Sequence, residues 1–122
     1  MGFAMKRVYE PAAASDGYRV LVDRLWPRGI SKERAELDEW AKDVAPSPEL
    51  RAEWHRADGD RFAEFAARYR AELDDNLAAG ALLAAGRERG RVTLLFGARD
   101  ERVNHAAVLL GWLGDRGADL EE

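Results

Sequence analysis

The sequence predicts a single α/β domain over residues 1–122, with a small, mostly parallel sheet of about three strands covered by four to five helices. Two segments, Tyr18–Leu25 and Val92–Phe96, contain consecutive apolar residues, which is typical of strands that helices cover on both faces. Between them, apolar residues recur at the spacing of one helix face. A chain of 122 residues is long enough to bury one core without a disulfide or a metal.

The first half of the chain supplies two of the expected strands and one helix. A short strand is expected at Lys6–Tyr9, and a stronger one at Tyr18–Leu25, where β-branched and aromatic residues gather. A Trp-Pro pair ends the second strand, because proline has no N–H to donate to the sheet. Ser31 is the expected N-cap of a helix that continues through Leu37 to Trp40.

The second half is expected to be helical on either side of the second apolar segment. Ser47, which proline and glutamate follow, has the pattern of a helix N-terminus. An amphipathic helix is expected from about Asp58, with a break at 74–76 before an alanine- and leucine-rich helix over 77–85. The last helix is expected at Asn104–Leu113, with glycines after it as stop signals.

The composition argues against several functional classes. The chain has no cysteine, which excludes disulfides, thiolate nucleophiles and cysteine-ligated metals. No stretch approaches the roughly 20 apolar residues that span a bilayer, and the first residues lack the apolar core of a signal peptide. We therefore expect a cytoplasmic protein that does not associate with membranes. The net charge of −4 argues against general binding of nucleic acid.

Charged residues follow the first apolar segment directly. In an open α/β sheet, ligands bind at the carboxyl ends of the strands. Asp23 is therefore a candidate proton acceptor, and Arg24 and Arg28 are candidates for gripping an anion. Trp26 is a candidate apolar wall of the same pocket. The structural alternative is that Asp23 pairs with an arginine and that Trp26 fills the core. Gly29 is expected to adopt a backbone conformation that other residues resist.

The loop after the second apolar segment leads into the last expected helix. A strand, a loop that opens with small residues and a helix N-terminus form a favourable site for a phosphate or carboxylate. Arg99 and Asn104 are the candidate ligand-binding residues there. His105 follows at the helix start, where the helix dipole favours a neutral imidazole suited to proton transfer. The structural alternatives are that Asp100 or Asn104 only caps the helix, and that His105 only ties it to a neighbouring loop.

Neither a metal site nor a serine nucleophile is expected. Asp23, Asp100 and His105 together would make a facial set of metal ligands, but no ligands have the close spacing of known metal motifs. The three serines lie in a loop and at expected helix caps, outside the elbow motif of serine hydrolases. No cofactor is expected either.

Several segments match one family at consecutive residues, the longest being Asp16–Gly29. The chain thereby resembles the YeaO-like family of small bacterial proteins, a domain family of unknown function. The resemblance covers roughly residues 5–113. The other matching parts of the chain are Lys6–Tyr9, Leu37–Trp40, the segment from Ala45 to Arg51, Tyr69 with Glu72 and Leu73, and the stretch from Thr93 to Ala106.

The resemblance implies a compact α/β domain without an assigned activity. It also implies which candidate residues carry more weight. Related sequences often have Ala-Lys-Asn where this chain has Ala98-Arg99-Asp100, so a proton-transfer role for Asp100 is disfavoured. Asp23 and His105 match the pattern better.

Two hypotheses of function follow. In the first, the arginines hold a small anionic metabolite at the carboxyl edge of the sheet, with or without acid–base hydrolysis by Asp23 and His105. In the second, the Arg-Trp-Pro-Arg loop docks a protein partner and no reaction takes place. Binding of RNA or DNA is a distant third. The sequence leaves the oligomeric state open, and it does not decide between an enzyme and a binding protein.

Overall fold

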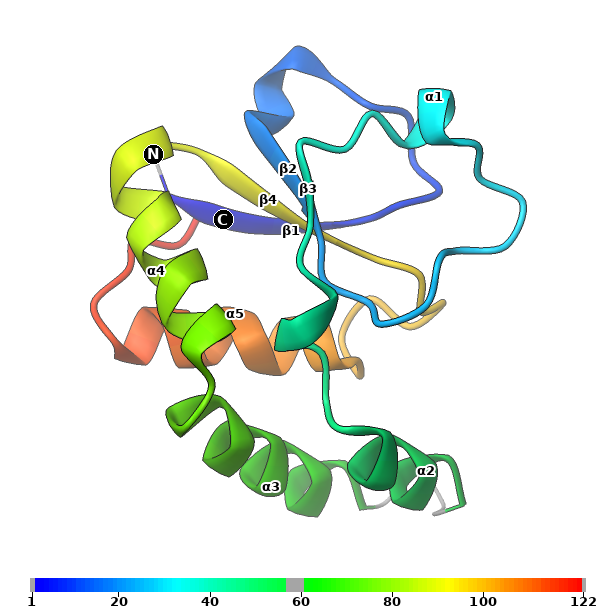
Figure 1. The fold of residues 1–122 in the computed structure, drawn as a ribbon, viewed down its shortest axis with the longest axis vertical. Coiled ribbons are helices and arrows are strands. Elements are labelled where there is room, and N and C mark those ends of the chain that lie inside the picture. The colour runs from blue at the N-terminus through cyan, green and yellow to red at the C-terminus, as the bar shows by residue number, and fades with distance from the viewer. Residues whose placement is uncertain (1, 57–60, 122) are drawn as a thin grey trace.

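The computed structural model describes residues 2–56 and 61–121, and these form a parallel four-stranded sheet with helices on both faces (Figure 1). The strand order is β1-β4-β2-β3. This confirms the predicted α/β class. The strands are β1 (Phe3–Arg7), β2 (Tyr18–Leu21), β3 (Glu39–Trp40) and β4 (Val92–Phe96). The helices are α1 (Lys32–Ala35), α2 (Pro48–Arg56), α3 (Phe62–Asp74), α4 (Leu77–Arg89) and α5 (His105–Asp115), with short 3-10 helices at Ala14–Asp16 and Lys42–Val44.

The two faces of the sheet carry unequal layers. Figure 1 shows α2–α5 on one side of the sheet and α1 with its flanking loops on the other. Val20 and Leu94 point into the larger cluster, with α3 and α5, whereas Leu21 and Leu95 point into the smaller one, with α1. All four side chains are fully buried. Consecutive apolar residues in β2 and β4 therefore serve both cores, as the sequence pattern predicts.

The central strands differ in how far they extend. β4 has the predicted bounds, but β2 ends at Leu21 rather than at Leu25. The N–H of Val22 still donates to Leu95 O at 3.0 Å, and the chain then leaves the sheet. β1 begins at Phe3, earlier than predicted, because Phe3 pairs with Val92 at the start of β4.

The strand at the β3 edge was not predicted, and the expectation of a helix through Trp40 is wrong. Ser31 caps α1 as predicted, accepting a hydrogen bond from the N–H of Arg34. The helix then ends after one turn, since Glu36 adopts a left-handed conformation with φ +45°. Glu39 and Trp40 pair with β2 instead. Pairing with a distant strand overrides the helical spacing of the apolar residues here.

The remaining helices begin and end near the predicted start and stop signals. Ser47 accepts a hydrogen bond from the N–H of Leu50 at the start of α2. The break at 74–76 is present, and Asn76 caps α4 through the N–H groups of Ala78 and Ala79. The expected start near Asp58 lies outside the described residues. In the part of the chain that the structure describes, no helix is long and apolar enough to cross a membrane.

A buried charged network lies on the α1 side of the sheet. Asp16 forms ion pairs with Lys6 and Arg19, and its carboxylate also accepts the N–H of Ala13 at 2.9 Å. The Arg19 guanidinium donates to Ala35 O at 2.8 Å. These donors lower the pKa of Asp16 below its ordinary value, although burial of the carboxylate opposes the shift. The network is fully paired and holds the chain before β2 against the sheet.

Candidate ligand-binding pocket

The candidate pocket lies where β2 and β4 end. The two strands are adjacent and parallel, so the chain leaves both at the same edge of the sheet. Asp23 and Arg24 follow β2, Gly97 follows β4, and His105 begins α5. The structure thus brings together Asp23, Arg24 and His105 from the two distant segments that the sequence analysis singled out.

Asp23 and His105 form a close pair. His105 Nε2 lies 3.1 Å from Asp23 Oδ1 and 3.1 Å from the carbonyl oxygen of Val22. Both neighbours are acceptors, so Nε2 carries the hydrogen, which it donates to Val22. Asp23 Oδ1 is buried and receives no hydrogen bond of normal geometry from the described residues. Asp23 Oδ1 is therefore a hydrogen-bond acceptor that the described protein atoms leave unused.

The other carboxylate oxygen holds Asp23 in place. Asp23 Oδ2 accepts the backbone N–H of Gly97 at 2.8 Å, which ties the end of β2 to the end of β4. A side chain at position 97 would bring its Cβ to 3.0 Å from this oxygen. Glycine therefore permits the close approach.

Arg24 is held loosely within the pocket wall. One guanidinium nitrogen makes long hydrogen bonds, both 3.4 Å, to the carbonyl oxygens of Ala45 and Pro46. Its Nε is buried and has no hydrogen-bond partner in the described part of the chain. Within residues 2–56 and 61–121, no carboxylate lies at ion-pair distance from it. A partly buried guanidinium that meets only two distant carbonyl oxygens is incompletely compensated, and a bound anion would supply the missing opposite charge.

These groups surround a cavity of about 250 Å³. Most of its lining is apolar, and the charged members come from three different elements of the fold. The lining residues are Asp23, Arg24, Leu25, Ala45, Pro46, Arg51, Trp54, Phe65, Gly97, Ala98 and His105. Trp54 of α2 and Phe65 of α3 stack with ring centroids 4.4 Å apart, and both line the cavity.

Tyr69 supports the pocket from within the core. Its hydroxyl donates to the carbonyl oxygen of Val44 at 2.6 Å, and its ring packs edge-on against His105 at 6.3 Å. Burial raises the pKa of the Tyr69 hydroxyl. The side chain is therefore a fixed, neutral hydrogen-bond donor that positions His105 and the chain around Val44.

Four of the sequence-predicted site residues do not line this cavity. The indole N–H of Trp26 donates to Ile30 O at 2.6 Å, and its ring packs against Trp40. The side chains of Arg28 and Arg99 are exposed elsewhere. Asn104 is fully buried as the N-cap of α5, and it accepts the N–H of Ala107 at 2.8 Å. Ligand contacts by these four residues, and docking through the Trp26 loop, stay predictions.

Sequence analysis missed the α2 side of the pocket. Arg51 and Trp54 of α2 line the cavity together with the residues that follow β2 and β4. Glu72 of α3 holds the start of α2, since its carboxylate accepts both the N–H and the hydroxyl of Ser47, at 2.9 and 2.6 Å. Arg51 lies in a segment that matches the family pattern, and this match was the one feature of the sequence that could have indicated a functional role for it.

The described residues offer no metal centre. Within 2–56 and 61–121, no group of three or more histidine, aspartate or glutamate side chains is close enough to hold a metal ion. Asp100 accepts the N–H groups of Arg102 and Val103 instead, and these bonds lower its pKa. It therefore acts as the cap of a turn in the loop before α5.

Comparisons with known proteins decide the family. A family model described as "Inactive DUF488-N3 subclade" matches residues 2–121. The Escherichia coli protein described as "Uncharacterized protein YeaO" is 49% identical over 113 residues, which cover 93% of this chain and 97% of the relative. The chain belongs to the YeaO-like family. No solved structure matches it significantly.

Other YeaO-like relatives agree in length and similarity. The Mycobacterium tuberculosis protein described as "Uncharacterized protein Rv3073c" is 49% identical over 110 residues, which cover 90% of this chain and 92% of the relative. A Mycobacterium bovis protein, "Uncharacterized protein Mb3100c", shows the same identity over the same length. Each relative is thus matched over almost its whole length, and none brings an assigned activity.

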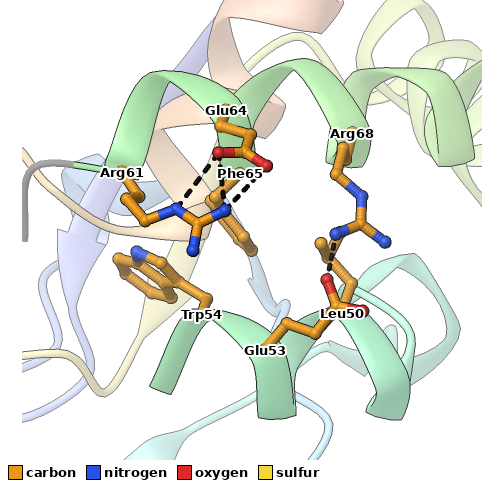
Figure 2. Close-up of a pocket in the computed structure, with 7 residues that line it drawn as sticks. All are labelled: Leu50, Glu53, Trp54, Arg61, Glu64, Phe65 and Arg68. Carbon is orange, nitrogen blue, oxygen red and sulfur yellow. Dashed lines mark hydrogen bonds and ion pairs between the residues drawn. The ribbon is translucent and has the colours of Figure 1, made fainter. Parts of the chain in front are cut away.

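A second cavity of this YeaO-like chain, of about 300 Å³, shares Trp54 and Phe65 with the first as lining residues. Figure 2 shows two ion pairs at this cavity, one between Arg61 and Glu64 of α3 and one between Arg68 of α3 and Glu53 of α2. These four side chains are about half exposed, and such pairs contribute little. Since its charges are already paired, this cavity offers a ligand less than the pocket at the sheet edge.

Proposed function

We propose that the protein binds a small anionic metabolite in the pocket at the carboxyl ends of β2 and β4. The observation that carries the proposal is that Arg24 lines the cavity and has, among the described residues, no carboxylate at ion-pair distance and no hydrogen-bond partner for its Nε. Guanidinium groups bind carboxylates and phosphates through paired donors. An anion would supply the negatively charged acceptor that the described protein atoms do not, since they offer Arg24 only two carbonyl oxygens at 3.4 Å.

The charges around the cavity support an anion rather than a cation. Arg51 lines the cavity and is exposed, and it adds a second guanidinium to that of Arg24. Asp23 is the opposing charge, and its Oδ2 is engaged by Gly97. Two guanidiniums against one partly engaged carboxylate give the pocket a positive field, which attracts anions from solution.

We propose binding without turnover. An aspartate–histidine pair is suited to proton transfer, and hydrolysis by Asp23 and His105 is the finer hypothesis. The chain, however, belongs to a subclade whose description calls it inactive. The Nε2–H group of His105 also donates to the carbonyl oxygen of Val22, and this hydrogen bond gives the side chain a structural role. In our proposal the pair shapes the pocket, and the ligand is a metabolite of the cytoplasm.

Nuclear magnetic resonance of the arginine Nε–H groups tests this proposal. Sodium phosphate and sodium acetate are titrated separately into the full chain, with sodium chloride at matched ionic strength as the reference. We expect the Arg24 signal to move with either anion. The melting temperature should rise as well, because a ligand at ten times its Kd stabilises the folded state by about 1.4 kcal/mol.

Two variants make the test specific. Arg24→Met should abolish both responses, whereas Arg87→Ala should keep them, because Arg87 is an exposed arginine on α4 that does not line this pocket. Equal stabilisation of wild type and Arg24→Met would overturn the proposal. Loss of the response in Arg28→Ala would also overturn it, because the anion would then bind at the Trp26 loop, outside the cavity.

A further inference from the structure

The geometry points to a ligand that carries one flat aromatic ring and one anionic group, rather than to a bare inorganic anion. This inference deepens the proposed function and rests on it. It concerns the part of the pocket that the arginines do not explain, which is its size and its apolar wall.

The cavity is too large for a small anion alone. A cavity of about 150 Å³ with an apolar lining accommodates benzene. The pocket here has about 250 Å³, which leaves room for a ring of that size together with a carboxylate or phosphate. An inorganic anion at Arg24 would leave most of the apolar surface in contact with water, and that surface favours an apolar body.

The shape of the wall favours a flat body. Trp54 and Phe65 are nearly parallel, with an angle of 19° between their planes, so the indole and the phenyl ring form one stack. Both rings line the cavity, so a ligand ring can pack against them. Leu25, Pro46 and Ala98 supply apolar contacts from other elements. Stacked aromatic pairs gain free energy beyond the area they bury.

The charges limit the ligand to a low negative charge. Asp23 lines the same cavity as Arg24, and its Oδ1 is buried without a normal hydrogen bond. A ligand with anionic groups at both ends would bring one of them toward this carboxylate, and like charges in a desolvated pocket repel strongly. One anionic group, bound at the arginine end, avoids that repulsion.

The experiment compares matched probes by isothermal titration calorimetry on the full chain. Benzoate carries the ring and the charge, acetate carries the charge alone, and benzyl alcohol carries the ring alone. Cyclohexanecarboxylate keeps the charge and the apolar bulk but has no aromatic face. Phenyl phosphate replaces the carboxylate with a phosphate ester, so it separates the two sources of the anionic group.

We expect benzoate or phenyl phosphate to bind about ten- to a hundredfold more tightly than acetate, because a ring-sized apolar body leaves water. Both should bind more tightly than cyclohexanecarboxylate by about a factor of three, because of stacking. Arg24→Met should remove the binding of the charged probes. Nuclear Overhauser contacts from the ring protons to the methyl groups of Ala45 and Ala98 should follow, since these alanines line this cavity and not the neighbouring one.

The outcomes separate this inference from the proposal beneath it. Equal affinity for acetate and benzoate would overturn the aromatic ligand and leave the anion site standing. Equal affinity for benzoate and cyclohexanecarboxylate would overturn the flat ring. If benzyl alcohol bound as tightly as benzoate, or if no charged probe bound, the anion site itself would fall. Ring contacts to Arg61 or Leu50 without contacts to Ala98 would place the ligand in the neighbouring cavity and overturn the inference.

Discussion

Buried charges cluster in two regions beside β2, and the regions differ in how completely their polar atoms are paired. Before β2, Asp16 is bound by Lys6, Arg19 and the N–H of Ala13. After β2, Asp23 Oδ1 and Arg24 Nε are buried without a normal hydrogen bond from the described residues, and both side chains line a cavity. Both regions contain an aspartate and an arginine. Only in the second do these residues keep polar atoms without a partner among the described residues and also line a cavity.

The difference teaches how to separate structural ion pairs from a candidate binding site. A buried charge is tolerated when its partners are built into the fold, and a ligand then has nothing to add. A buried charge that lacks a partner destabilises the fold unless some other function maintains it. The network around Asp16 is therefore structural, whereas the pocket around Arg24 is the place to look for a ligand.

The largest effect is expected in the paired network. Asp16→Asn removes the charge that compensates Arg19, whose side chain is buried, so it should cost about 3–5 kcal/mol of unfolding free energy. Urea unfolding at pH 7, followed by circular dichroism, measures the loss. A cost below about 1 kcal/mol would contradict the structural role of the network.

The pH dependence of the unfolding free energy of the same variant tests whether the charge of Asp16 is the cause of this loss. The folded-state pKa of Asp16 lies below the ordinary value of 3.8, so its ion pairs stabilise the fold above that pH. This stability is lost as the pH falls through the lowered folded-state pKa. The difference in unfolding free energy between wild type and Asp16→Asn should therefore be constant from pH 7 to about pH 5 and shrink below pH 4. A difference that grew on acidification would have the wrong sign for this cause.

A smaller effect is expected at Trp26, which tests the expectation that it lines a pocket. Trp26→Phe keeps a ring against Trp40 but removes the hydrogen bond to Ile30 O, so it should cost about 0.5–1.5 kcal/mol. Thermal unfolding measures this loss. The affinity for benzoate should stay within a factor of two of wild type. A large loss of affinity for benzoate without a loss of stability would instead indicate that Trp26 belongs to the binding site.

The smallest effect on stability is expected at Arg24. Arg24→Met replaces a loosely held guanidinium with an apolar chain of similar length, so the unfolding free energy should stay within about 1 kcal/mol of wild type. Urea unfolding in a buffer without phosphate or carboxylate is the measurement. A loss as large as that of Asp16→Asn would mean that the two regions do not differ, and the case for the pocket would weaken accordingly.

Much of the secondary structure was predictable from local signals. Val92–Phe96 is a strand with the expected bounds, and Ser31 and Asn104 cap the helices that follow them. Gly29 adopts φ +77°, as its place after the Trp-Pro turn predicts. Each signal acts over a few residues, because hydrogen bonds to nearby backbone groups and steric limits on φ are local.

The edge strand β3 and the part of the pocket that α2 contributes could not be predicted from such local signals. Trp40 has helical spacing from Leu37, yet it pairs with β2, because a partner strand far along the chain offers its free N–H and C=O groups. Trp54 has the spacing of a core residue and also lines the cavity. Arg19 lies in a predicted strand, but nothing local indicates that Asp16 would meet its guanidinium inside the protein.

The sequence alone determined the α/β class, the family and the positions of Asp23 after one strand and of His105 at the start of the last helix, because periodicity, caps and apolar runs are properties of neighbouring residues. The tertiary structure decided that these two side chains meet, that Arg24 Nε has no partner among the described residues and that Arg51 and Trp54 of α2 line the cavity. Those facts depend on which strands pair and on how helices cross them. Such contacts join residues far apart along the chain, and no short stretch of sequence contains them.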